Sequence, residues 1–373
     1  MSAVMGAVSM DATCDRESLL RHLQVVEKGT SKRSSIQVLA GIQIAAHGGE
    51  LHLAATDMEL SVRTRVPAQI DTDGVVVVPG KLLLDIMRSL GGETVQLRLA
   101  EGMLVIESDG ARYEQHVFNT DDFPQLPPTS GNLFSLDRDA LMETVSAVSR
   151  AASTDESRPV LTGVKVQISS EKLTMVATDS YRLSVRDTSI QTDLPEPVEA
   201  IIPARALNEL TRIADASAAA SIAIGIEAGQ VLFGVDETWV TARRIEGQFP
   251  NHTQLIPQAF EHEAIIDRAE LLDVVNRARV VAQRNPVRLA FSTGQLTVSA
   301  ATQDIGSAEE TLPIKYEGED LTIGFNADYL RDGVQSFDDD TVTLQLISPL
   351  RPGLLSGEDG ALLYLIMPVR LPE

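Results

Sequence analysis

The sequence has very little cysteine, few aromatic residues and no long apolar run. Cys14 is the only cysteine among 373 residues, so the chain forms no internal disulfide, which is typical of a protein in a reducing compartment. No apolar stretch approaches the ~18 residues that a membrane-spanning helix requires, and the first ten residues lack the basic start and apolar centre of a signal peptide. We therefore expect a soluble, cytoplasmic, multidomain protein in which residues 1–10 form a disordered extension.

The sequence also lacks the short motifs of common enzymes. It contains no P-loop, no Gly-x-Ser-x-Gly segment and no His or Cys cluster at metal-ligand spacing, so we expect neither a cofactor nor a metal site. An enzyme remains an alternative, because Thr56-Asp57 recurs as Thr178-Asp179 and two aspartates can share a catalytic site, as in aspartic proteases. Those proteases carry the aspartate in Asp-Thr-Gly or Asp-Ser-Gly, which neither pair matches.

The sequence contains one pattern that is repeated three times. Each copy opens with an Asp-Arg dipeptide and apolar residues at helical spacing, starting at Asp15, Asp137 and Asp267. The first two copies also share an Ala-Thr-Asp segment at Thr56 and Thr178, 122 residues apart. This period is far longer than the roughly 20 to 50 residues of a solenoid unit, so each copy is expected to be a domain with its own core. The expected domains are residues 11–129, 130–258 and 259–373.

Within each copy the pattern predicts a helix, several strands, a second helix and further strands. In the first copy, alternating apolar residues predict strands over 36–44 and 60–64, and Pro79-Gly80 precedes a predicted helix over 81–88. Counterparts of this helix are expected over 203–212 and 325–331. Consecutive strands joined by tight turns, with few helices, predict an α+β fold built from antiparallel sheets.

Basic residues are scarce and unevenly placed. The chain has 31 Lys and Arg against 53 Asp and Glu, and a formal net charge of −22 argues against general nucleic-acid binding. The predicted helices with their adjoining loops nevertheless hold 17 basic and 15 acidic residues, whereas the rest of the chain holds 14 and 38. Either helices simply tolerate Lys and Arg well, or the helices share a near-neutral surface while the remaining surface repels polyanions.

Three segments, in this order and spacing, resemble the bacterial DNA polymerase III beta subunit, the sliding clamp family. They are Ala177–Leu183, Gly324–Asn326 with Tyr329, and the closing Tyr364–Leu371. The resemblance runs from about Asp11 to Leu371. It implies three repeated clamp domains, each with antiparallel sheets and two helices, that assemble as a head-to-tail dimeric ring. The helices would line the hole, and duplex DNA would pass through it without sequence-specific readout.

The resemblance also implies roles for particular residues. Those expected to face DNA are basic: Lys32, Arg33, Arg88, Arg150, Arg158, Arg205, Arg212 and Arg284. Those expected to close the ring are Arg112 and Tyr113 on one side, with Val280, Val281, Glu309 and Glu310 on the other.

Partner proteins of this family insert a short peptide into a groove between the second and third domains. The matching positions are Leu161, Thr178, Ser180, Tyr181, Arg182, Leu183, Pro250, Leu255, Asn326, Tyr329, Leu350, Met367, Pro368, Val369, Arg370 and Leu371. The expected partners are the replicative polymerase alpha subunit, the clamp loader delta subunit and other clamp-motif peptides. The expected function is processivity without catalysis, and a DNA-free scaffold of the same fold is the remaining alternative.

Overall fold

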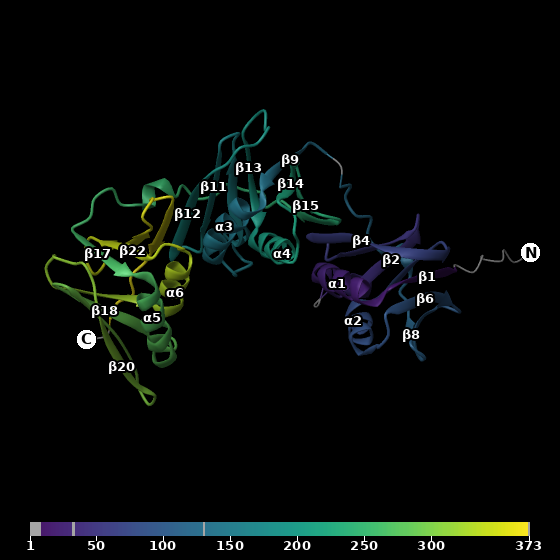
Figure 1. Cartoon of the computed structure of the whole chain (residues 1–373). Helices are drawn as coiled ribbons and strands as arrows, with labels where there is room; N and C mark the ends of the chain where they lie inside the picture. The colour runs from purple at the N-terminus through teal and green to yellow at the C-terminus, as the bar shows by residue number, and fades with distance from the viewer. Residues whose placement is uncertain (1–8, 32–33, 130, 372–373) are drawn as a thin grey trace, which may run out of the picture. The chain divides into compact units, whose positions relative to one another are not determined.

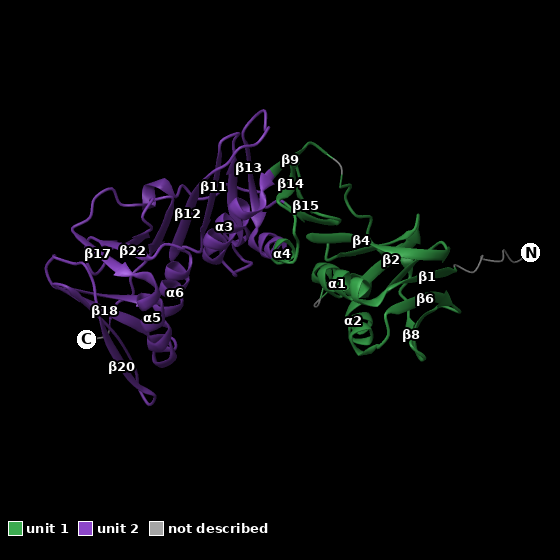
Figure 2. Cartoon of the chain, in the orientation of Figure 1, with its two compact units in different colours: residues 1–135, 212–243 green, residues 136–211, 244–373 purple. Residues whose placement is uncertain are grey.

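The computed structural model describes residues 9–31, 34–129 and 131–371, and the chain divides into two compact units. Unit 1 comprises residues 1–135 and 212–243, and unit 2 comprises residues 136–211 and 244–373 (Figure 2). The middle copy of the repeat therefore contributes to both units. Within the described residues, no helix is long and apolar enough to cross a membrane.

The described residues form six α-helices, two for each copy of the repeat (Figure 1). They are α1 (Arg16–Val26), α2 (Gly80–Ser89), α3 (Arg138–Val148), α4 (Ala204–Asp215), α5 (Arg268–Ala282) and α6 (Ala327–Gln335). The Asp-Arg dipeptides start α1, α3 and α5 as predicted. Asp15, Asp137 and Asp267 each accept the backbone N–H three residues ahead, at 2.7 to 2.9 Å, and so cap the helix.

The first sheet consists of antiparallel strands in the order β8-β7-β6-β1-β4-β16-β15-β14-β9, with β2, β3 and β5 joined beside β4. Its strands are β1 (Met10–Asp15), β2 (Gly41–His47), β3 (Glu50–Thr56), β4 (Leu60–Thr72), β5 (Gly74–Pro79), β6 (Thr94–Ala100), β7 (Met103–Ser108), β8 (Ala111–His116), β9 (Leu133–Asp137), β14 (Ser221–Ile226), β15 (Gln230–Val235) and β16 (Thr238–Arg243).

Unit 2 contains two further antiparallel sheets, in the orders β13-β10-β11-β12-β24-β23-β22-β17 and β20-β19-β18-β21. Their strands are β10 (Gly163–Ile168), β11 (Lys172–Thr178), β12 (Arg182–Ser189), β13 (Val198–Pro203), β17 (His262–Asp267), β18 (Pro286–Ser292), β19 (Gln295–Thr302), β20 (Gly306–Pro313), β21 (Leu321–Asn326), β22 (Thr341–Leu346), β23 (Gly353–Ser356) and β24 (Leu362–Ile366).

Two strand pairs join neighbouring copies of the repeat. In unit 1, β4 of the first copy pairs with β16 of the second, with Leu60 opposite Ala242. In unit 2, β12 of the second copy pairs with β24 of the third, with Arg182 opposite Ile366. We call these the first and second junctions. Because each junction continues a sheet from one copy into the next, the repeats are linked by backbone hydrogen bonds as well as by the connecting chain.

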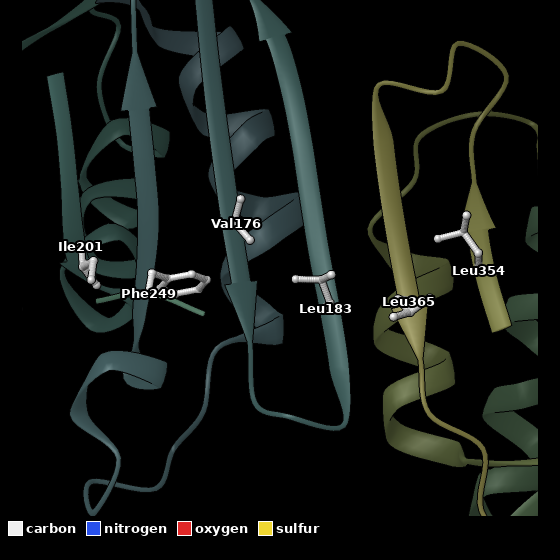
Figure 3. Packing of buried hydrophobic residues seen from close by; sticks show 6 residues of the cluster. All are labelled: Val176, Leu183, Ile201, Phe249, Leu354 and Leu365. Atoms are coloured by element: carbon white, nitrogen blue, oxygen red, sulfur yellow. The ribbon is translucent and has the colours of Figure 1, made fainter. Parts of the chain in front are cut away.

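A buried apolar cluster lies at the second junction. It consists of Val176, Leu183, Ile201, Phe249, Leu354 and Leu365, which come from β11, β12, β13, the loop after β16, β23 and β24 (Figure 3). Each of these side chains is less than a tenth exposed. The cluster therefore packs side chains of the second and third copies into one core.

The predicted strand over 36–44 is wrong in its first half. Residues Gln37–Ala40 form a short 3₁₀ helix, and β2 begins only at Gly41. Val38 and Leu39 are both buried in one cluster with Val77 and Phe123. Adjacent residues of a strand point to opposite faces, so a helical turn is needed to bury both neighbours on the same side.

The start of β1 corrects the expected extension. Met10 is buried and pairs with Leu99, so it belongs to the first sheet rather than to an extension over residues 1–10. Residues 1–8 of the expected extension lie outside the described part of the chain.

Removing a helix cap should lower stability measurably. We expect Asp267→Ala to lower the free energy of unfolding by about 1 kcal/mol, because the N–H of Glu270 loses its acceptor at the start of α5. Urea unfolding followed by circular dichroism measures this. Asp273→Ala removes an exposed carboxylate from the same helix without touching the cap, so an equal loss in both variants would contradict the capping role.

Candidate functional site

A tight turn joins β11 to β12 and presents one large side chain at the surface. Thr178 Oγ1 donates to the carbonyl of Arg182 at 2.7 Å, and Asp179 Oδ1 accepts the N–H groups of Tyr181 and Arg182 at 2.9 Å. Ser180 has a φ of 82°, which non-glycine residues rarely adopt and which the hydrogen bonds of the turn hold in place. The turn buries Thr178 and Asp179 and leaves Tyr181 58% exposed.

The first copy forms the same turn between β3 and β4. Thr56 Oγ1 donates to the carbonyl of Leu60 at 3.0 Å, Asp57 Oδ1 accepts the N–H groups of Glu59 and Leu60 at 3.0 and 2.8 Å, and Met58 has a φ of 76°. Each aspartate is therefore bound by the backbone of its own turn. This structural role accounts for the repeated Thr-Asp pairs.

The C-terminal segment runs along the turn of the second junction. The N–H of Met367 donates to the carbonyl of Tyr181, and the N–H of Val369 donates to the carbonyl of Gly324, both at 2.8 Å. A side chain at Gly324 would come within 2.7 Å of Leu371 Cδ2, so the glycine permits the close approach of the segment. Met367 and Val369 remain 42% and 40% exposed, Arg370 is exposed, and Pro368 ends the pairing of β24.

Tyr329 of α6 lies against this turn. Its ring stacks beside Tyr181 with centroids 6.4 Å apart, and the Arg182 guanidinium lies 4.4 Å from the Tyr329 centroid. Arg182 also pairs with Asp179 at 3.1 Å. Asn326 caps α6 by accepting the N–H of Tyr329 at 3.1 Å, so the start of the helix fixes the position of this ring. The arrangement is an aromatic surface supported by a cation.

A buried polar cluster packs against the aromatic surface formed by Tyr181 and Tyr329. The Arg182 guanidinium donates to Asp332 at 2.6 Å and to the Tyr364 hydroxyl at 3.3 Å, and that hydroxyl donates to the carbonyl of Tyr329 at 2.9 Å. Burial is the main cause that raises the pKa of Tyr329 and of Tyr364, so both phenols stay protonated and Tyr364 can donate. Burial alone would lower the pKa of Arg182, but the facing Tyr364, Asp332 and Asp179 outweigh it and raise that pKa.

The other residues expected in the groove have different surroundings. Leu161 and Leu183 are buried, and Leu183 belongs to the cluster of Figure 3, so both support the surface instead of lining it. Leu255, in the 3₁₀ helix Thr253–Leu255, and Leu350, between β22 and β23, are exposed, as is Pro250.

Three residues of the polar cluster were absent from the predicted site: Asp179, Asp332 and Tyr364. The sequence carries one usable signal for them. Tyr364 stands within the apolar strand Leu362–Ile366, and a buried tyrosine hydroxyl needs a hydrogen-bond partner. Its acceptor, the Tyr329 carbonyl on α6, is 35 residues away in the sequence and is brought near only by the tertiary structure.

The basic residues expected to face DNA lie, with one described exception, on α-helices or within two residues of an α-helix end: Arg88, Arg150, Arg205, Arg212 and Arg284. The exception is Arg158, which donates to Asp155 at 3.1 Å and to Ser180 Oγ at 3.0 Å and is thereby held beside the turn of the second junction. Lys32 and Arg33 lie outside the described residues.

The residues expected to close a ring lie on two end strands and at a helix end. Arg112 and Tyr113 are on β8, which ends the first sheet, and Glu309 and Glu310 are on β20, which ends the four-stranded sheet. Val280 and Val281 are in the last turn of α5. Val280 is 73% exposed and Tyr113 is 38% exposed, which are large values for apolar side chains.

Two charged members of this set, Arg112 and Glu310, already have partners in their own chain. Arg112 pairs with Glu107 at 2.6 Å and with Glu114 at 2.7 Å, and these hydrogen bonds raise its pKa. Glu310 pairs with Arg277 at 2.7 Å, which lowers the pKa of the carboxylate.

Known proteins share this architecture over nearly the whole chain. Sequence models of the DNA polymerase III beta subunit match in order, with its N-terminal domain over residues 10–127, its central domain over 135–251 and its C-terminal domain over 253–370. The beta sliding clamp of Streptomyces coelicolor is 32% identical over 374 residues, which cover 97% of this chain and 100% of the relative.

Solved structures agree. The DNA polymerase sliding clamp from Bacillus subtilis superposes with a TM-score of 0.89 at 27% identity, covering 97% of this chain and 100% of that one. The DNA polymerase III subunit beta sliding clamp from Pseudomonas aeruginosa bound to griselimycin gives 0.88 at 26% identity, with the same coverage. The fold is therefore that of a DNA sliding clamp, with three α+β domains built from antiparallel sheets and paired helices. The chain belongs to the DNA polymerase III beta subunit family.

Proposed function

We propose that this protein is a processivity factor that encircles duplex DNA and holds the replicative DNA polymerase on it, without catalysis of its own. The observation that carries the proposal is that the likeness to beta sliding clamps covers 97% of the chain, all three copies of the repeat included. A ring stays on DNA by enclosing it. It therefore needs only weak contacts with phosphates, whereas a protein that grips many phosphates resists movement and is strongly sensitive to salt.

The proposed ring consists of two copies joined head to tail, so two different surfaces of the chain meet at each closure. Residues Arg112 and Tyr113 of one copy would face Val280, Val281, Glu309 and Glu310 of the other. What supports this pairing is that β8 and β20 end their sheets, and end strands present unpaired backbone groups to a partner. Since Arg112 and Glu310 already have partners, burial of the apolar side chains should stabilise the dimer more than ion pairs between the subunits do.

The proposed DNA-facing surface is formed by the helices, with the basic residues named above as weak phosphate contacts. Its support is the uneven charge: the helical segments are near neutral, and the remaining chain carries the excess of acid. An acidic outer surface would repel DNA, so the duplex would be favoured only along the helices. The expected domain limits at residues 129 and 258 belong to this proposal.

The proposed partner site is the surface formed by Tyr181, Tyr329, Met367 and Val369, with Leu255 and Leu350 as further walls. Exposed apolar and aromatic side chains beside a few polar groups suit an extended peptide with apolar anchors. Gln-x-x-Leu-x-Phe peptides of the polymerase alpha subunit, the clamp loader delta subunit and other clamp-bound proteins are the proposed ligands.

DNA retention should depend on topology. Once an ATP-driven clamp loader has placed the protein on nicked circular DNA, we expect the complex to survive a wash at high salt, because enclosure does not depend on charge. Cutting the circle should release the protein. The measurement is gel filtration of labelled protein with circular and linearised DNA. Equal retention on both forms contradicts the ring and favours an adhesive protein, whereas no retention on either form favours a DNA-free scaffold.

A charge at the proposed ring closure should separate the subunits. Val281→Asp would place a carboxylate in the apolar contact, and we expect monomers at micromolar concentration in sedimentation experiments, where the unchanged protein forms dimers. Leu133→Asp introduces the same charge at an exposed apolar position outside the proposed closure and should leave the dimer intact. An unaltered dimer in Val281→Asp would mean that the ring closes elsewhere.

Loss of the C-terminal segment should abolish peptide binding without separating the dimer. Deleting residues 367–373 eliminates the exposed Met367 and Val369. When the surface that binds an anchoring side chain of the peptide is lost, the binding free energy typically weakens by ~2 kcal/mol or more. We expect no detectable binding of a labelled Gln-x-x-Leu-x-Phe peptide by fluorescence anisotropy, with the dimer intact in sedimentation. A chain that ends at Leu371 is the matched control. If the longer deletion binds the peptide as well as this control does, the groove is misassigned.

A further inference from the structure

A nearly buried row of charges lies beneath the aromatic surface of the second junction. Asp179, Arg182 and Asp332 have side chains only 10%, 9% and 14% exposed, and the guanidinium joins the two carboxylates at 3.1 and 2.6 Å. Removing such charges from water is costly, and apolar residues of similar volume often serve stability as well or better. A buried ion pair therefore suggests a requirement other than stability.

The first junction shows that the turn does not need these charges. It has the same hydrogen bonds from Thr56 and Asp57, although Leu60 stands where the second junction has Arg182. The following strand is also joined in the same way, since the N–H of Arg243 donates to the carbonyl of Glu59 at 2.9 Å, as Met367 does to Tyr181. Neither the turn nor the strand pairing therefore requires an arginine at position 182.

The two junctions differ in what they expose. At the first junction, Glu59 and Arg243 form an exposed ion pair at 3.5 Å. At the second junction, the equivalent positions hold Tyr181 and Met367, and the exposed surface is apolar and aromatic. Of the two junctions, only the second has the buried ion pairs of Arg182, and it is also the junction that carries the aromatic surface.

The contacts of Arg182 lead to Tyr329. The guanidinium lies 4.4 Å from the ring centroid, and it also donates to the Tyr364 hydroxyl, which in turn donates to the Tyr329 carbonyl. Asp332 is on α6, one helical turn beyond Tyr329, and its 2.6 Å hydrogen bond draws the guanidinium toward that helix. Side chain and backbone of Tyr329 are thus both held through one cation.

We propose that Asp332 is a positioning residue for peptide recognition: it holds Arg182 under the Tyr329 ring and so fixes the aromatic surface before a peptide arrives. This inference rests on the proposed peptide groove. A ring held in its bound orientation loses little side-chain freedom on binding, which increases affinity without any contact between Asp332 and the peptide. Asp332 also pairs with its neighbour Arg331 at 2.6 Å, but its contact with the aromatic surface runs through Arg182 to Tyr329.

The test combines two substitutions in the full-length dimer. Asp332→Asn keeps the size of the side chain but weakens its hold on Arg182, and we expect about a tenfold loss of affinity for the labelled Gln-x-x-Leu-x-Phe peptide, as for other coupled contact pairs. In a Tyr329→Leu background, the same substitution should cost less than twofold, because the ring that it positions is gone. Thermal unfolding and sedimentation of each variant establish that the dimer is folded.

Asp187→Asn is the matched control. It removes the carboxylate of a surface ion pair between β11 and β12, with Lys172 at 2.7 Å, and it should leave peptide affinity unchanged. Two results overturn the inference: wild-type affinity in Asp332→Asn, or an equal loss in both backgrounds, which would indicate a general structural role. If the wild-type dimer itself fails to bind the peptide, the proposed groove is wrong as well.

Discussion

The pairing of edge strands is the constraint on which the rest of this structure depends. A sheet edge leaves backbone N–H and C=O groups without partners, and a chain of repeated sheets has such an edge at every copy. Here β4 pairs with β16 and β12 with β24, so the inner edges are satisfied by the neighbouring copy. The first sheet ends at β8 and β9 and the four-stranded sheet at β20 and β21; of these strands, β8 and β20 hold residues proposed to close the ring.

The junctions explain how one repeated turn can support different surfaces. Both are built on the same Thr-Asp turn, in which a buried threonine and an aspartate satisfy the backbone. Because this turn forms regardless of the residues at its tip, the tip is free to vary. An exposed ion pair, Glu59 with Arg243, stands at one junction, and an aromatic surface over Arg182 stands at the other.

The distribution of charge fits a protein that must contact DNA weakly. Helical segments with nearly balanced charge offer a phosphate backbone little attraction, and the strongly acidic remainder offers repulsion. Several arginines are further restrained by neighbours, since Arg150 donates to Gln335 at 2.9 Å and Arg88 pairs with Asp85 at 3.5 Å. In the proposed ring such contacts would hold the duplex loosely enough to slide.

The sequence alone determined the repeats, the six helix positions and the antiparallel α+β class, because these follow from local signals: Asp caps, apolar spacing and breaker residues at fixed intervals. It failed at residues 37–40, where burial of two adjacent side chains required a helical turn. It named Tyr181, Arg182, Tyr329 and Met367, but through resemblance and not through any local rule. Only the tertiary structure placed Asp332 and Tyr364 beside Arg182. A buried charge binds the partners that packing brings within hydrogen-bond distance, and the separation of two residues in the sequence does not predict that distance.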